Sequence, residues 1–191
     1  MAVSLFLELY GNLNGNLGEE SKYSEFFVKG DVKGEVGRKA HNSVFKIHGN
    51  VHGDVGSLAT DSVFKIGGNV EGCLGLASKN CKFFVGGEVD AIPFSSDNSF
   101  EIRGNVERGI YNLENCYLIV EGNVGEIYRI KNCEILVGGK IGSYELLEGC
   151  IIYCDWAINK EMRKINSSNG NKILKKEIWP YRPKNFKFNK Q

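Results

Sequence analysis

The chain has 191 residues, of which 42% are hydrophobic and 25% charged, a composition typical of a folded soluble protein and not of a disordered one. No apolar run reaches the roughly 20 residues that a membrane-spanning helix needs. The net charge of +1 is unevenly distributed, because residues 1–154 carry a net −6 and residues 155–191 a net +7. We therefore expect an acidic body, residues 1–154, followed by a basic, aromatic C-terminal tail, residues 155–191.

The first seven residues lack the charged segment and cleavage motif of a signal peptide. We therefore expect a cytoplasmic protein whose six cysteines are reduced. Twenty-four glycines against three prolines favour a fold with many tight backbone corners.

A repeat of 17–19 residues runs through the body, and its core is a Gly-Asn-Val triplet or a close variant. The eight copies start at Gly11, Gly30, Gly49, Gly68, Gly87, Gly104, Gly122 and Gly139. Successive copies are 19 residues apart four times, and then 17, 18 and 17 apart. Repeats of about this length are typical of solenoids, in which each unit buries its apolar face against its neighbours.

Aligned copies form columns of chemically similar residues ahead of each glycine. Two residues before it stand Leu9, Val28, Ile47, Ile66, Val85, Ile102, Val120 and Val137. Two positions earlier stand Leu7, Phe26, Phe45, Phe64, Phe83, Phe100, Leu118 and Ile135. Another two positions earlier stand Ser24, Ser43, Ser62, Cys81, Asn98, Cys116, Cys133 and Cys150. This period of two predicts a β-strand with one buried face in every copy.

The columns predict an all-β fold, a single parallel β-helix of about eight coils with a short C-terminal α/extended capping tail. Like residues stack over like residues, and parallel strands rise about 4.8 Å per coil. The phenylalanines from Phe26 to Phe100 are then expected to stack inside the helix. Coil lengths that vary between 17 and 19 residues favour a right-handed helix over a left-handed hexapeptide one.

The coil from Ile47 to Val55, Ile-His-Gly-Asn-Val-His-Gly-Asp-Val, resembles the I-x-G-x-V-x-G-x-I coil of bactofilins. Bactofilins are bacterial cytoskeletal proteins that form right-handed β-helices and polymerise end to end. The Gly-Asn-x-x-Gly-x-x-Gly spacing is also similar to the GxGxG β-helix domain of glutamate synthase and formylmethanofuran dehydrogenase subunits, where it is mainly structural. Either resemblance covers about residues 5–150 and implies a β-helix with a mainly structural role.

Outward-facing positions become apolar toward the C-terminal end of the body. We expect a contiguous patch there, formed by Tyr117, Ile119, Leu136, Ile151 and Tyr153. Such patches mark binding surfaces, and the occupant is either the chain's own tail, another protein or a second copy. The tail adds Trp156, Trp179 and Tyr181 to this candidate interaction surface.

The tail is expected to close the open end of the helix, because solenoids need a cap. Residues 155–165 have the spacing of a short helix, and an extended segment follows from Lys172. The stretch Lys184–Lys190 interleaves lysines with Phe186 and Phe188, a pattern that can stack bases. The acidic body favours docking of this stretch on the protein itself, which argues against nucleic acid as the partner.

Some residues invite a chemical interpretation, but structural roles explain them better. Cys81, Cys116, Cys133 and Cys150 share a column with serines, and no Cys-x-x-Cys spacing supports zinc. His48 and His52 occupy columns filled elsewhere by ordinary polar residues. The asparagines that follow the repeat glycine are interpreted as a hydrogen-bonded ladder at a corner with left-handed backbone: Asn12, Asn50, Asn69, Asn105 and Asn123.

We therefore expect a non-enzymatic scaffold or protein-interaction module, self-assembling as bactofilins do, with no catalytic, cofactor or metal site. A first alternative is a monomeric or dimeric β-helix that binds a macromolecule, as an inhibitor or accessory subunit. A second is a carbohydrate-active β-helix using carboxylates among Glu35, Asp54 and Glu71. Only Asp90–Asn98, which contains Pro93, is expected as an irregular loop.

Overall fold

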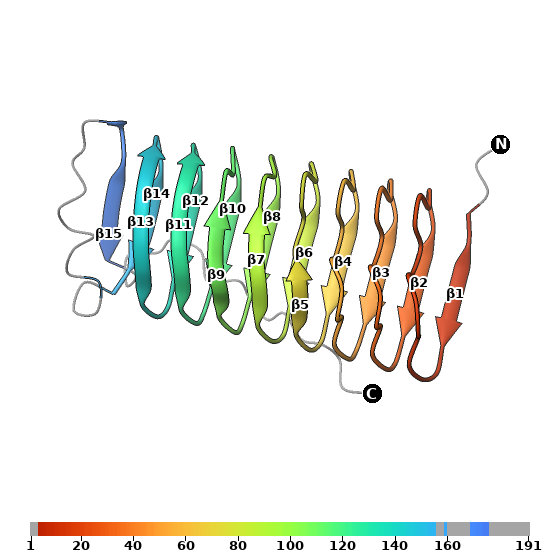
Figure 1. Ribbon diagram of the computed structural model, residues 1–191. Helices are drawn as coiled ribbons and strands as arrows, with labels where there is room; N and C mark the ends of the chain where they lie inside the picture. Colours follow the sequence, from red (N-terminus) through yellow and green to blue (C-terminus); the bar gives the residue numbers. More distant parts are fainter. Residues whose placement is uncertain (1–3, 156–158, 160–168, 176–191) are drawn as a thin grey trace.

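A computed structural model describes residues 4–155, 159 and 169–175 of the chain (Figure 1). Over this range the protein is an all-β parallel solenoid of about nine turns. The predicted single parallel β-helix is confirmed.

The described strands form two parallel sheets that follow the solenoid axis. The larger sheet has ten strands: β1 (Phe6–Leu9), β2 (Glu25–Val28), β3 (Val44–Ile47), β4 (Val63–Ile66), β6 (Lys82–Val85), β8 (Ser99–Ile102), β10 (Tyr117–Val120), β12 (Glu134–Val137), β14 (Ile151–Cys154) and β15 (Lys172–Lys175). The smaller has five: β5 (Val70–Cys73), β7 (Val89–Pro93), β9 (Val106–Tyr111), β11 (Val124–Lys131) and β13 (Ile141–Glu148). From the turn of β4 to the turn of β12, each turn supplies one strand to each sheet (Figure 1).

The solenoid extends beyond the eight copies counted on glycines. The turn of β14 lacks the repeat glycine, because Trp156 stands at that position in the sequence, two residues after Cys154. Strand β15 pairs with β14 in the register Ile151↔Lys172. Strand β15 therefore continues the large sheet from within the segment expected to be the tail. Of the expected cap at 155–165, only Asp155 and Asn159 lie among the described residues.

The aromatic column packs as predicted. The register of the large sheet places Phe26, Phe45, Phe64, Phe83 and Phe100 over one another. Neighbouring rings have centroids 4.8–5.0 Å apart and planes within 8° of parallel. Four of these rings, from Phe45 to Phe100, are fully buried, and they form the centre of a core that runs the length of the solenoid.

Glycine is required where the chain turns against this stack. Gly56 has a φ of 69°, and a Cβ there would lie 2.6 Å from Cε1 of Phe83. Both the backbone conformation and the aromatic column therefore exclude a side chain. At Gly68 a Cβ would lie 2.3 Å from Oδ1 of Asn50, so this glycine makes room for a side chain of the preceding turn.

That side chain belongs to the predicted ladder, whose hydrogen bonds are present. Oδ1 of Asn50 accepts the N–H of Asn69 at 2.8 Å, and Oδ1 of Asn69 accepts the N–H of Glu88 at 2.9 Å. The expectation of left-handed backbone at these asparagines is wrong. Left-handed residues occupy two other columns, one of which runs from Glu20 to Leu146. The other, called the left-handed column here, lies one position before the serines and cysteines: Tyr23, Asn42, Asp61, Asn80, Asp97, Asn115 and Asn132, with φ between 48° and 55°.

The expected irregular loop at Asp90–Asn98 is also wrong. Residues Val89–Pro93 form β7, and Phe94 turns the chain with a φ of 50°. Pro93 pairs with Tyr111 in the small sheet, and Ser96 continues the stacking as an isolated bridge. The segment therefore follows the solenoid path. Its sequence departs from the repeat pattern because this turn is two residues shorter than the turns before it.

Truncating the middle of the aromatic column should destabilise the solenoid. Phe64→Ala leaves a cavity between two stacked rings and is expected to cost about 3–5 kcal/mol of unfolding free energy, measured by urea denaturation. Phe94→Ala is the matched control, because that ring is 57% exposed. Equal losses in the two variants would contradict the energetic role assigned to the stack.

Candidate functional site

The large sheet brings together the five described members of the predicted apolar patch. Tyr117 and Ile119 lie on β10, Leu136 on β12, and Ile151 and Tyr153 on β14, all on the outer face. They form a cluster separate from the core, joined by Leu174 of β15. Trp156, Trp179 and Tyr181 lie outside the described residues.

The centre of this cluster is covered and not freely exposed. Ile119 is 5% exposed and Tyr153 6%, whereas Tyr117, Leu136 and Ile151 are half-buried. Burial also raises the pKa of the Tyr153 phenol, and the neighbouring Glu134 carboxylate raises it further. A partner would thus reach the cluster mainly through its half-buried members.

The cysteines of this column make the same hydrogen bond as the serines of earlier turns. The thiols of Cys81, Cys133 and Cys150 each donate to the carbonyl two residues earlier, at 3.2–3.3 Å. The hydroxyls of Ser24, Ser43 and Ser62 make the same bond at 2.8–3.0 Å. Burial raises the pKa of Cys81 to about 11, so its thiol is protonated and unreactive at neutral pH.

The histidines and the candidate carboxylates are engaged in separate local contacts. Nδ1 of His52 lies 2.8 Å from Oε2 of Glu71. Oδ1 of Asp54 accepts the N–H of Cys73 at 2.8 Å, and Glu35 lies 3.8 Å from Arg38. Among the described residues, no group of three or more His, Cys, Asp or Glu side chains could hold a metal ion.

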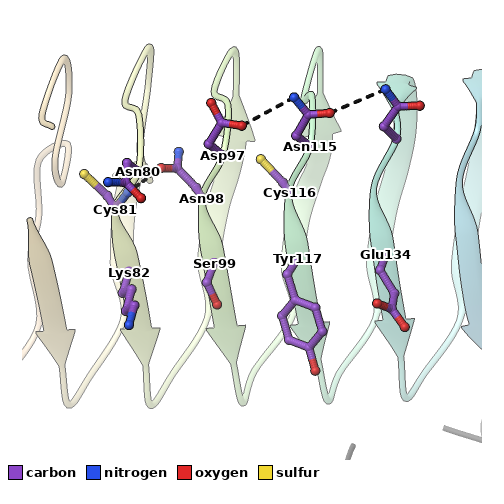
Figure 2. Close-up of a pocket in the computed structure, with 11 residues that line it drawn as sticks. Asn80, Cys81, Lys82, Asp97, Asn98, Ser99, Asn115, Cys116, Tyr117 and Glu134 are labelled. Atoms are coloured by element: carbon purple, nitrogen blue, oxygen red, sulfur yellow. Dashed lines mark hydrogen bonds between the residues drawn. The ribbon is translucent and has the colours of Figure 1, made fainter. Parts of the chain in front are cut away.

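A shallow open groove of about 460 Å³ runs along one corner of the solenoid (Figure 2). The left-handed column forms one wall, and its side chains bond from turn to turn, as in Asn115 to Asp97 at 3.3 Å and Asn132 to Asn115 at 3.4 Å. The lining residues are Asn80, Cys81, Lys82, Asp97, Asn98, Ser99, Asn115, Cys116, Tyr117, Asn132 and Glu134. This column was not predicted, although Asn or Asp precedes the serine and cysteine position in six turns.

At the C-terminal end, an asparagine side chain completes the backbone ladder. Oδ1 of Asn159 accepts the N–H of Ile141 at 2.8 Å, and its Nδ2 donates to the carbonyl of Gly139 at 3.1 Å. One turn earlier, the N–H of Val124 is satisfied by the carbonyl of Lys140 at 2.9 Å. The buried amide of Asn159 therefore stands in for the backbone of a further turn.

A second asparagine, Asn171, occupies the serine and cysteine column one turn beyond Cys150, beside the large sheet. Oδ1 of Asn171 accepts the N–H of Cys150 at 2.9 Å, and its Nδ2 donates to the carbonyl of Leu147 at 2.8 Å. Asn171 leads into β15, an edge strand with a lysine at each end, Lys172 and Lys175. Charged edge strands of this kind resist pairing with other chains.

The N-terminal end is built differently. Strand β1 is the other edge of the large sheet, and β2 is its one partner strand within the described range. Its apolar side chains are open to solvent, with Leu5 50%, Phe6 66%, Leu7 36% and Tyr10 68% exposed. These are four of the eight large hydrophobic residues exposed in the described part of the chain.

In comparisons with known proteins, no protein-family model, curated protein or solved structure matches the chain. No helix in the described segments is long and apolar enough to cross a membrane.

Removing the Asn159 amide should weaken the C-terminal end. Asn159→Ala leaves the buried N–H of Ile141 without its acceptor, which is expected to cost about 1–3 kcal/mol in urea-monitored unfolding. Asn14→Ala, at an exposed position in the first turn, is the control. A loss no larger than that of the control would show that the amide does not close the ladder.

The thiols should differ in reactivity as their burial predicts. With a thiol-specific reagent at neutral pH, we expect at most one thiol per native chain to react, that of half-buried Cys73, and all six to react in denaturant. Cys73→Ser should lower the native count to zero. Rapid labelling of a buried cysteine in the native protein would contradict the packing described above.

Proposed function

We propose that the chain is a non-enzymatic structural module that acts by assembling with other macromolecules, foremost with copies of itself. The observation that carries the proposal is the exposed edge strand β1 at the end of a stacked solenoid. Proteins normally cover or blunt such edges, because an open strand pairs with other chains. An open edge with four exposed apolar side chains is therefore suited to association.

Two further features support a scaffold role. The resemblance of the Ile47–Val55 coil to bactofilins associates this type of solenoid with end-to-end assembly. The ladders of stacked rings and asparagines join each turn to the next, which suits a stiff spacer. The six free thiols fit a reducing compartment such as the cytoplasm.

The second candidate function is binding of a carbohydrate, and the corner groove favours it. Its wall of amides and carboxylates, with Tyr117 beside it, offers hydrogen bonds and an aromatic surface to a polyhydroxylated chain. The groove is shallow, and its Asn and Asp side chains already bond to one another. Soluble glycans that shift the amide signals of Asn115 and Asn132 would favour this second function.

The molar mass of the full chain tests the proposal. Light scattering with negative-stain imaging should show a species heavier than the 21.2 kDa monomer, with a heavier fraction that grows with concentration. Phe94→Asp, which places a charge at an exposed position away from both ends, should leave the mass unchanged. A chain that stays monomeric at every concentration tested, and that retains no partner, would overturn the proposed role.

A further inference from the structure

We infer that the occupant of the N-terminal edge is a second copy of this chain, paired head to head through antiparallel β1 strands. This inference rests on the proposed assembly function and adds the head-to-head arrangement, the antiparallel register and closure at a dimer. Three features of the described residues lead to it: the direction of the β1 backbone groups, the pattern of its side chains and the closure of the opposite end.

The backbone of β1 offers hydrogen-bonding groups to a partner. The N–H of Glu25 donates to the carbonyl of Leu5 at 2.8 Å, and that of Lys29 to the carbonyl of Leu9 at 2.9 Å. Residues in the Leu5, Leu7 and Leu9 positions therefore direct their groups toward β2. Because the direction alternates along a strand, the N–H and carbonyl groups of Phe6 and Glu8 point out of the end of the solenoid.

The side chains favour an antiparallel register centred on Leu7. A pairing centred on Leu7 places Leu7 opposite its symmetry mate and Leu5 opposite Leu9, so the leucines of both copies extend one core. The same register makes Phe6 and Glu8 partners in hydrogen-bonded pairs. Centring on Glu8 would place two carboxylates directly opposite one another, which is unfavourable.

The opposite end of the solenoid limits growth. Head-to-tail stacking would need an open C-terminal turn, but Asn159 already bonds the backbone of Ile141 and Gly139, where a further turn of the small sheet would pair. Strand β15 presents Lys172 and Lys175 at that edge, and like charges would face each other if two such ends met. An isologous contact between two N-terminal ends closes at a dimer.

A charge exchange in β1 tests both the contact and the register. Phe6→Glu places a carboxylate opposite Glu8 twice per dimer and should raise the dimer Kd about 2- to 30-fold, measured by sedimentation equilibrium. Phe6→Lys removes the same ring but faces Glu8 with an opposite charge, so its Kd should stay well below that of Phe6→Glu. The double variant Phe6→Glu/Glu8→Lys should restore dimerisation. All these side chains are exposed, so the fold should tolerate the changes.

The outcomes separate this inference from the proposed function. A dimer whose Kd responds equally to Phe6→Glu and Phe6→Lys, or to neither, would assemble elsewhere; the inference would fall and the assembly role would stand. Polymers longer than two would likewise overturn the closed dimer but not the role. A chain that is monomeric and retains a foreign protein on β1 would overturn the second copy as occupant, and a monomer without any partner would overturn both.

Discussion

The hydrogen-bond ladder between successive parallel turns is the constraint on which the rest of the structure depends. It sets one spacing for every column, so whatever occupies a position in one turn is held directly over its equivalent in the next. The phenylalanine rings stack at 4.8–5.0 Å because the spacing between strands imposes this distance, and not because ring–ring attraction sets it. Each column therefore accepts only side chains that can pack against a similar side chain at this distance in the neighbouring turn.

The corners of the solenoid present the harder problem, since the chain bends there and carbonyls no longer meet every N–H. Side chains supply the missing acceptors. Oγ of Ser43 accepts the N–H of Ser24 at 3.2 Å, and Oδ1 of Asn12 accepts the N–H of Asp31 at 2.8 Å. Asn171 repeats this solution one turn beyond Cys150, and Asn159 applies it at the C-terminal end of the small sheet. This explains why small polar residues and glycines are common at the corners, where the polar side chains are used to satisfy backbone N–H groups.

The amino-acid sequence predicts the columns well because each depends on local alternation repeated many times. Phe64 and Ser62 could be placed from periodicity alone. The left-handed column was harder to recognise, since Tyr23 begins it and Asn and Asp are common on any surface. The pairing of β15 with the large sheet was not predicted, because 21 residues, not 17–19, separate Cys150 from Asn171. The roles of Asn159 and the burial of Ile119 depend on contacts between distant segments, which no repeat pattern contains.

The unequal ends of the solenoid also give its unfolding a direction. Every turn contacts only its neighbours, so local opening costs least where one neighbour is absent. The first turn lacks such a neighbour in the described structure, and its leucines replace the phenylalanines that later turns stack. The last described turns instead have Asn159 and Asn171 bonded across them. Thermal fraying would then travel from β1 inward, and a partner bound at that edge, as proposed, would protect the part of the solenoid that opens first.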